Sequence, residues 1–110
     1  MTKAKAAKCN VSRYAFTRNS SNSATPVTMV TSADGWCWTE PTHPKDGSGY
    51  PAEVKLAPSH GQAAIVIGNS GGSMLSYRPA PGYVGPDHFQ FLVYPIDIIL
   101  DFTVDVQAAP

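Results

Sequence analysis

Apolar residues recur at every second position over two stretches near the C-terminus, residues 88–94 and 98–107. A period of two is that of a β-strand with one buried face, because successive side chains of a strand point to opposite sides of its sheet. The apolar positions of these stretches are Phe89, Phe91, Val93, Leu100, Phe102, Val104 and Val106. Helical periodicity is almost absent from the rest of the chain, so the sequence predicts an all-β fold.

Prolines and glycines divide the chain into short segments. Ten prolines and nine glycines in 110 residues indicate frequent turns, and this length suits one domain. Strands are expected at residues 9–18, 27–31, 36–39, 53–56, 62–68, 73–78, 88–94 and 98–107. Seven or eight short strands without a helix are typical of an antiparallel β-sandwich.

The composition argues against several classes of protein. Hydrophobic residues make up 43% of the chain and charged residues 15%, which fits neither a coiled coil nor a disordered chain. Eight basic and eight acidic residues cancel, so net charge does not support nucleic-acid binding. No apolar run approaches the ~20 residues of a membrane span. The N-terminus lacks the apolar stretch of a secretory signal, so either a signal has been removed or this route was never used.

Charge is unevenly distributed along the chain. Residues 1–18 carry five basic residues and no acid, whereas residues 79–110 carry four aspartates and no base. We expect residues 1–8 to form a basic tail and residues 9–110 to form the sandwich domain. The lysines of this tail are Lys3, Lys5 and Lys8. They either stay solvated or contact an acidic surface of this domain or of a neighbour, and we expect them to bind a partner.

The chain has two cysteines, Cys9 and Cys37. Two cysteines allow one intramolecular disulfide, and the alternative is a pair of free buried thiols. A disulfide would indicate a protein that meets an oxidising environment. In the chain-entropy model, a bridge of this span stabilises the fold by roughly 3–4 kcal/mol.

A longer ordered pattern runs through the second half of the chain. It contains Pro58-Ser59-His60-Gly61, then Tyr77-Arg78-Pro79, then the ten residues from Gly82 to Phe91, which read Gly-Tyr-Val-Gly-Pro-Asp-His-Phe-Gln-Phe. This pattern resembles the immunoglobulin-like and cadherin-like repeats of bacterial and phage proteins. Those repeats combine Pro-x-His-Gly, Tyr-x-Pro, Gly-[Tyr/Phe]-x-Gly-x-Asp and Phe-x-[Tyr/Phe]. The match covers residues 58–94, and residues 98–106 fit the final strand of the family.

The resemblance implies an immunoglobulin-like β-sandwich in which the matched residues have structural roles. Gly61 lets the chain turn into its strand, and Gly82 and Gly85 permit a tight crossover between the sheets. Asp87 is expected to bind backbone amides of a loop. The residues expected to fill the space between the sheets are Tyr77, Phe89 and Phe91.

Two segments vary the family pattern. The usual Asp-x-x-Gly hairpin before the last strand is replaced by residues 95–97, which read Pro-Ile-Asp. The spacing of Cys9 and Cys37 is shorter than that of the antibody-type bridge between sheets. The segment Gly35-Trp36-Cys37-Trp38 is similar to a variant in which the cysteine pairs back to the first strand. The resemblance therefore implies a Cys9–Cys37 disulfide, whereas residues 1–50 are otherwise weakly covered by it.

Residues that could carry chemistry are scattered along the chain. The segment 68–72 contains Ser70 in a Gly-x-Ser-x-Gly pattern, but strands flank it on both sides, and we interpret it as a hairpin turn. The histidines lack the spacing of zinc ligands, and the acidic turn residues lack the run of ligands that calcium sites use. These residues are His43, His60, His88, Asp34, Asp46, Asp87 and Asp97. We therefore expect no enzymatic activity, no metal and no cofactor.

For two groups of aromatic and apolar residues, the sequence leaves two structural interpretations. Trp36 and Trp38 share one face of their strand. We expect this face to be the core, and the alternative is a carbohydrate platform formed with Tyr50. Leu92 and Tyr94 lie on the outward face of their strand. They form either an apolar patch for a partner or a surface covered by the N-terminal segment or by residues 40–51.

These features together describe a non-catalytic structural or interaction module. The setting we favour is a decoration protein on the exterior of a virion, such as a phage capsid or tail, with proteins of that assembly as partners. The alternative is a secreted bacterial cell-surface or adhesion module that binds carbohydrate or calcium. Both settings place the protein on a virion or outside the cell, with no nucleic acid and no membrane span.

Overall fold

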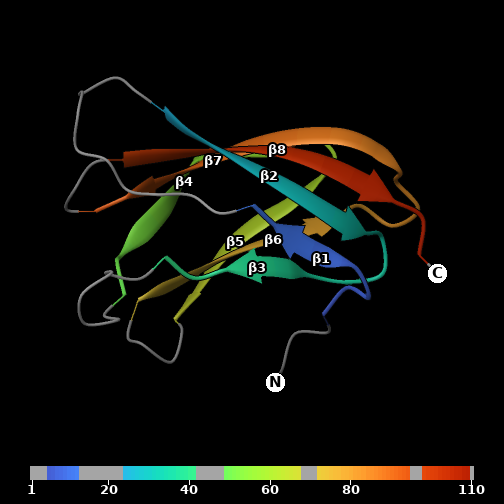
Figure 1. The fold of residues 1–110 in the computed structure, drawn as a ribbon, viewed down its shortest axis with the longest axis horizontal. Coiled ribbons are helices and arrows are strands. Elements are labelled where there is room, and N and C mark those ends of the chain that lie inside the picture. Colours follow the sequence, from blue (N-terminus) through green and yellow to red (C-terminus); the bar gives the residue numbers. More distant parts are fainter. Residues whose placement is uncertain (1–4, 13–23, 42–48, 68–71, 95–97, 110) are drawn as a thin grey trace.

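The computed structural model describes residues 5–12, 24–41, 49–67, 72–94 and 98–109. In this part of the chain eight strands form two facing sheets, and there is no helix (Figure 1). The strands are β1 (Cys9–Val11), β2 (Ala24–Ser32), β3 (Cys37–Thr39), β4 (Ala52–Leu56), β5 (Gly61–Ile67), β6 (Ser73–Pro79), β7 (Gly85–Val93) and β8 (Ile98–Gln107). The larger sheet has the order β1-β2-β8-β7-β4 and the smaller one the order β3-β6-β5. The predicted all-β sandwich is confirmed.

The predicted strands agree with the observed ones except for a few residues at their ends. The strand predicted at residues 9–18 is observed as β1, which ends at Val11, and its residues 13–18 lie outside the described part of the chain. Among the other strands, the largest differences are at β2 and β7, which begin earlier than expected. β2 includes Pro26, which has no amide hydrogen to donate to a neighbouring strand. The strand accommodates this proline because β1 pairs with β2 at Met29–Thr31 and does not reach Pro26.

One strand pair differs from the antiparallel arrangement expected from the sequence. β2 and β8 run parallel, with Val27 beside Phe102 and Met29 beside Val104. The other pairs are antiparallel. The parallel pair brings the second strand of the chain next to the last one and buries Val27 and Met29 completely against β8.

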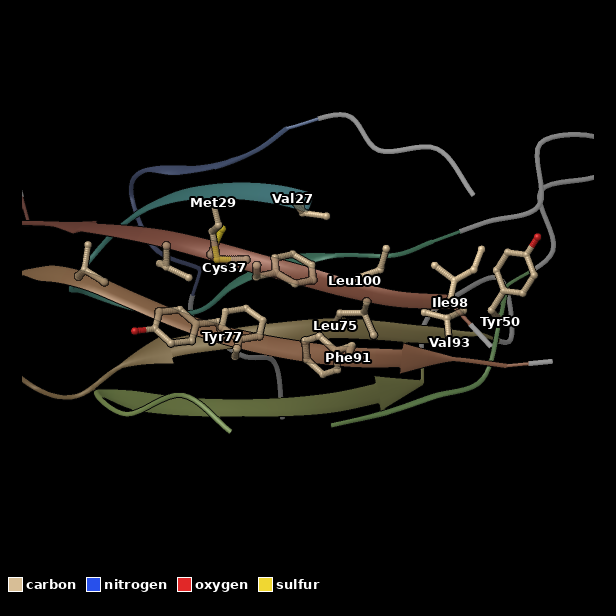
Figure 2. Packing of buried hydrophobic residues seen from close by; sticks show 14 residues of the cluster. Val27, Met29, Cys37, Tyr50, Leu75, Tyr77, Phe91, Val93, Ile98 and Leu100 are labelled. Atoms are coloured by element: carbon tan, nitrogen blue, oxygen red, sulfur yellow. The ribbon is translucent and has the colours of Figure 1, made fainter. Parts of the chain in front are cut away.

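Aromatic rings fill the centre of the sandwich (Figure 2). Phe89 stacks on Tyr77 with the ring centroids 5.1 Å apart, and on Phe102 at 4.7 Å. Phe91 meets Phe89 and Phe102 edge-on, at 5.4 and 5.8 Å. Tyr77 comes from β6 of the smaller sheet and the phenylalanines come from β7 and β8 of the larger one. These fully buried rings therefore hold the two layers together.

A buried carboxylate ties a turn to both sheets. Asp87 on β7 accepts hydrogen bonds from the backbone amides of Ser59 and His60, at 3.0 and 3.1 Å. It also accepts the hydroxyl hydrogen of Tyr77 on β6, at 2.7 Å. The ring of His60 stacks on Tyr83, with the centroids 4.2 Å apart. Asp87 thus contacts loop amides, the kind of contact that its place in the sequence pattern indicated.

The glycines of the sequence pattern are required for two different reasons. Gly82 and Gly85 have φ angles of 79° and 140°, which L residues with a side chain rarely adopt. Gly61 lies in β5 beside β6, where a Cβ would stand 2.3 Å from the carbonyl oxygen of Arg78. The sequence predicts that Gly61 lets the chain turn into its strand, and the structure adds a second requirement, the close approach of two backbones.

A disulfide bond joins Cys9 of β1 to Cys37 of β3, with the Cα atoms 5.2 Å apart. β1 is an edge strand of the larger sheet and β3 is an edge strand of the smaller one. The bond therefore closes one side of the sandwich. The predicted disulfide is confirmed, and the alternative of two free thiols is wrong.

Candidate interaction surfaces

The N-terminal segment lies against the sandwich where the structure describes it. Lys8 is held by both its backbone and its side chain. Its amide donates to Ser32 Oγ at 2.9 Å, its carbonyl accepts from the Ser32 amide at 2.9 Å, and its Nζ donates to Gln107 Oε1 at 2.6 Å. This lysine therefore contacts its own domain. Its expected contact with an acidic surface of a neighbour remains a prediction.

The residues before Lys8 are fixed by the turn that precedes β3. The amide of Ala6 donates to the Trp36 carbonyl at 2.9 Å, and Ala6 is buried. The amide of Ala7 lies 3.3 Å from both carboxylate oxygens of Asp34. The hydroxyl of Ser32 also donates to Asp34, and this hydrogen bond lowers the pKa of the Asp34 carboxyl below its usual value. The exposed Asp34 carboxylate is thus one of several contacts that hold the N-terminal segment against the sandwich, beside the backbone bonds of Ala6 and Lys8.

Leu92 and Tyr94 lie at one end of the larger sheet. Leu92 faces outward between Glu53 of β4 and Ile99 of β8, and it is half-buried. The amide of Tyr94 donates to the Pro51 carbonyl at 2.9 Å, and its hydroxyl donates to the Glu53 carboxylate. Residues 51–53 therefore cover part of Tyr94, while Leu92 and Ile99 form an apolar pair. Binding of a partner by Leu92 and Tyr94 remains a prediction.

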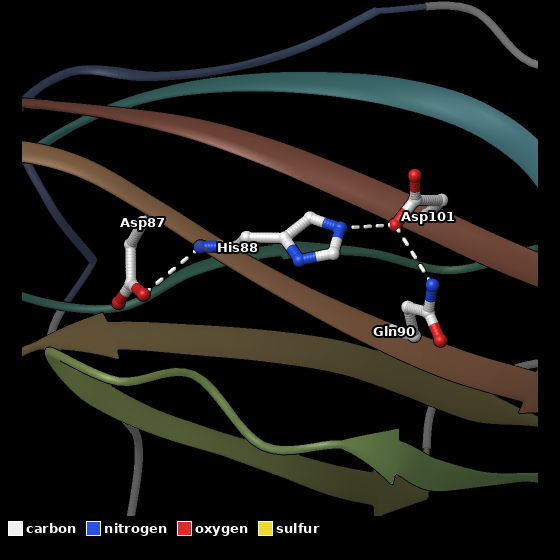
Figure 3. Close-up of polar contacts among 4 residues, drawn as sticks. All are labelled: Asp87, His88, Gln90 and Asp101. Atoms are coloured by element: carbon white, nitrogen blue, oxygen red, sulfur yellow. Dashed lines mark hydrogen bonds and ion pairs between the residues drawn. The ribbon is translucent and has the colours of Figure 1, made fainter.

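A polar cluster occupies the same outer face (Figure 3). His88 Nε2 contacts the carboxylate of Asp101, and Gln90 Nε2 donates to the same oxygen at 3.1 Å. The side chains of His88 and Asp101 are 47% and 31% exposed. Because solvent screens such a pair, it stabilises the fold by only about 0.2–1 kcal/mol when the histidine is protonated. The cluster links β7 to β8 on the surface of the larger sheet.

Trp36 and Trp38 do not lie in the core, and this expectation from the sequence is wrong. They share a face as predicted, but Cys37 between them is fully buried and points inward to its disulfide. The two indoles therefore lie on the outer face of the smaller sheet, where both are half-buried. Lys5 Nζ lies 5.4 Å from the ring centroid of Trp38, and Arg78 Cζ lies 6.0 Å from that of Trp36. Each indole thus makes a cation–π contact with a basic side chain.

Tyr50 is separated from these tryptophans. Its side chain belongs to the core, at the end where Val93 and Ile98 also lie (Figure 2). Tyr50 therefore does not form a carbohydrate platform with Trp36 and Trp38. The sequence did not predict that Lys5 and Arg78 lie over the two indoles. The outward position of the tryptophans was predictable, because a disulfide-bonded Cys37 that points inward requires its two neighbours to point outward.

The other residues considered for chemistry do not form a site in the part of the chain that the structure describes. Among these residues, no three His, Cys, Asp or Glu side chains gather as metal ligands would. No helix found there has the length and apolar character that crossing a membrane requires. The positions that lie outside the described residues are Lys3, His43, Asp46, Ser70, the turn at residues 95–97 and therefore Asp97.

Comparison with known proteins does not identify a function, so the proposal below is based on the surfaces described above. The chain matches no protein-family model, and no curated protein is significantly similar to it in sequence.

Proposed function

We propose that this protein is a non-catalytic interaction module with an immunoglobulin-like fold that decorates the exterior of a virion, on a phage capsid or tail. The neighbour order of the strands supports the immunoglobulin-like part of the proposal. In immunoglobulin-type sandwiches, strands B, E and D are neighbours in one sheet and C, F and G in the other. Here β3, β6 and β5 have the first order, and β4, β7 and β8 have the second.

The observation that carries the proposed location is the disulfide between Cys9 and Cys37. Disulfides persist in oxidising surroundings and are rare in the cytosol. This bond joins the edge strands of the two sheets, so its formation fastens the whole fold. A virion protein is assembled inside a cell and then exposed outside it. The disulfide would form on exposure to the oxidising exterior and would stabilise the fold there.

Two partly apolar sheet faces support a role in assembly. Leu92 and Ile99 lie together on the outer face of the larger sheet, and Trp36 and Trp38 lie on the outer face of the smaller one. Outer faces of a sandwich that stay in water are usually polar. Apolar side chains on both faces fit a module that is held between neighbours.

The experiment that tests this proposal is to locate the chain by mass spectrometry in purified virions and in the envelope and secreted fractions of the producing cells. The proposal expects the chain in the virion fraction, with a stoichiometry set by the symmetry of the particle. Enrichment in the envelope or secreted fraction would support the alternative, a bacterial cell-surface or adhesion module. Recovery from the cytosolic fraction alone, with both thiols reduced, would contradict both.

A further inference from the structure

The outer face of the smaller sheet combines apolar bulk with positive charge. Because Cys37, Leu75 and Tyr77 lie in the core, the residues that alternate with them face outward. We name this surface the indole face and define it by Trp36, Trp38, Ala64, Val66, Met74, Ser76 and Arg78. The tryptophans lie in and next to the edge strand β3. Their outward neighbours on β6 and then on β5 extend the surface across the sheet.

One outward position of the indole face, Ser76, is completely covered. Ser76 occupies an outward position on β6, directly beside Trp38 on β3. Nevertheless Ser76 has no exposed surface, and its hydroxyl has no hydrogen-bond partner among the described residues. Its neighbours must therefore cover it. A surface that is already packed in this way loses little conformational entropy when a partner binds.

Both indoles carry a cation that remains in contact with solvent. Lys5 lies over Trp38 and Arg78 lies over Trp36, and both basic side chains are exposed. A guanidinium held against an aromatic ring still presents its N–H groups at its edge, where they can bind a carboxylate in bidentate fashion. The outward positions of β3, β5 and β6 in the described sheet hold no carboxylate. Glu40 follows β3 in the same alternation as Trp36 and Trp38, and it is already engaged in an interaction of its own. The indole face is thus complementary to negative charge.

We propose that the indole face is the docking surface for an acidic segment of a partner protein, with Arg78 and Lys5 binding its carboxylates. Tryptophan, methionine and arginine are the residues enriched in protein–protein interfaces, and tryptophan and arginine dominate their hot spots. A sugar ring would stack on a free face of an indole. Here the two cations already cover one face of each ring, which favours carboxylates of a protein over a stacked glycan.

This inference rests on the proposed function, since it names the surface through which the module would be held. It can be tested separately, because both tryptophans of the chain belong to the indole face, and tryptophan fluorescence excited at a wavelength that tyrosine does not absorb reports on that face alone. The probe is a polyglutamate peptide, titrated into the intact disulfide-bonded protein. Polylysine is the control for charge sign, and polygalacturonate is the control for an acidic glycan.

The expected result is a saturable change in tryptophan fluorescence with polyglutamate. Arg78→Ala should weaken this binding about tenfold, as for a hot-spot arginine. Lys55→Ala is the matched control, because it removes the same charge from an exposed position on β4 of the other sheet. It should leave binding unchanged. Unfolding midpoints of both variants establish that the fold is intact.

Three results would overturn the inference. Polyglutamate could leave the fluorescence unchanged at every concentration. Arg78→Ala and Lys55→Ala could weaken binding equally, which would indicate attraction by charge alone. Polygalacturonate could bind more tightly than polyglutamate, which would assign the surface to a glycan. None of these results depends on where the chain is located in virions or cells, so a failure of the proposed function is recognised independently by fractionation.

Discussion

Tyr77 of the smaller sheet donates its hydroxyl hydrogen to the buried carboxylate of Asp87 on the larger sheet, over 2.7 Å. Asp87 is 7% exposed, and its other acceptor sites bind the amides of the turn before β5. The bond therefore joins both sheets and one connecting turn at a single point. A hydrogen bond to a buried charged group is stronger than one between neutral groups.

Tyr77→Phe should lower the free energy of unfolding by about 1.5–3 kcal/mol at neutral pH, because it removes a donor from a buried carboxylate while it keeps the ring. Urea unfolding followed by circular dichroism measures this loss. Tyr83→Phe is the control, since Tyr83 donates its hydroxyl to the Pro86 carbonyl at an exposed position. A loss no larger for Tyr77→Phe than for this control would contradict the assigned role.

Alkaline pH should destabilise the fold through the same residue. Burial, followed by the hydrogen bond to Asp87, raises the pKa of Tyr77 well above that of a free tyrosine. In the unfolded chain the phenol ionises near pH 10, so the contribution of Tyr77 is complete below that pH. Above it, the free energy of unfolding should fall by up to about 1.4 kcal/mol per pH unit until the folded-state pKa is reached.

The measurement is the urea midpoint as a function of pH from neutral to strongly alkaline, for the wild type and Tyr77→Phe. The difference between the two proteins should shrink as the pH rises above 10. Parallel curves, with a constant difference over the whole range, would show that Tyr77 does not titrate differently in the two states.

Local pattern predicts the strands of this protein well, but not the partners that they choose. Alternation identifies β7 and β8 because apolar residues occupy every second position of each and form one buried face. It contains no information on the parallel pairing of β2 with β8, because this contact joins the second strand of the chain to the last one, far apart in the sequence. The same limit applies to Pro26, whose place in a strand is acceptable only because β1 stops short of it.

The indole face illustrates why the candidate surface was harder to predict. Period two places Trp36 and Trp38 on one face and Cys37 on the other, but does not say which face is inside. Hydrophobicity favours burying two indoles. The disulfide decides otherwise, because Cys37 can reach Cys9 only from the inner face. The position of Lys5 over Trp38 depends on the path of the N-terminal segment, which a local sequence pattern does not predict.

Two glycine substitutions should separate steric cost from backbone strain. Gly61→Ala should destabilise the fold by about 1–3 kcal/mol, because its Cβ would overlap the carbonyl oxygen of Arg78 in the neighbouring strand. Gly82→Asn should cost less than about 1 kcal/mol. Gly82 has a φ of 79° with nothing within 4 Å of a Cβ, and asparagine tolerates this region. Thermal unfolding of the two variants under one set of conditions gives the comparison, and the reverse order would refute the steric argument.

Loss of the disulfide should have the largest effect on stability. The double variant Cys9→Ala, Cys37→Ala should lose roughly 3–4 kcal/mol, because the unfolded chain is no longer restricted by a bridge across 28 residues. Wild-type protein unfolded in the presence of a reductant should resemble this variant. Mass spectrometry without reduction provides the control, and recovery of two free thiols from an oxidising environment would refute the bond itself.

Acid should break the contact between the Ala7 amide and Asp34 before the sandwich unfolds, while the backbone bonds of Ala6 and Lys8 still hold the segment. The hydrogen bond from Ser32, together with the Ala7 amide, keeps the Asp34 carboxyl ionised to lower pH than a free aspartate. A carboxyl whose pKa is lowered by folding contributes stability above its unfolded pKa of about 3.9, and this contribution disappears as the pH falls through the lower folded value. The Ala7 amide signal followed by NMR should therefore titrate below pH 3.9.

Asp34→Asn keeps the shape of the side chain but has no proton to gain, so its Ala7 amide signal should not titrate in this range. The Ser59 amide, which binds Asp87 and makes no contact with Asp34, serves as an internal reference in the same spectra. If the Ala7 signal of the wild type moves only together with that of Ser59, the Ala7 contact is lost by global unfolding and does not depend on Asp34 alone. Separate movement, absent in Asp34→Asn, would assign the loss of this contact to this one carboxylate.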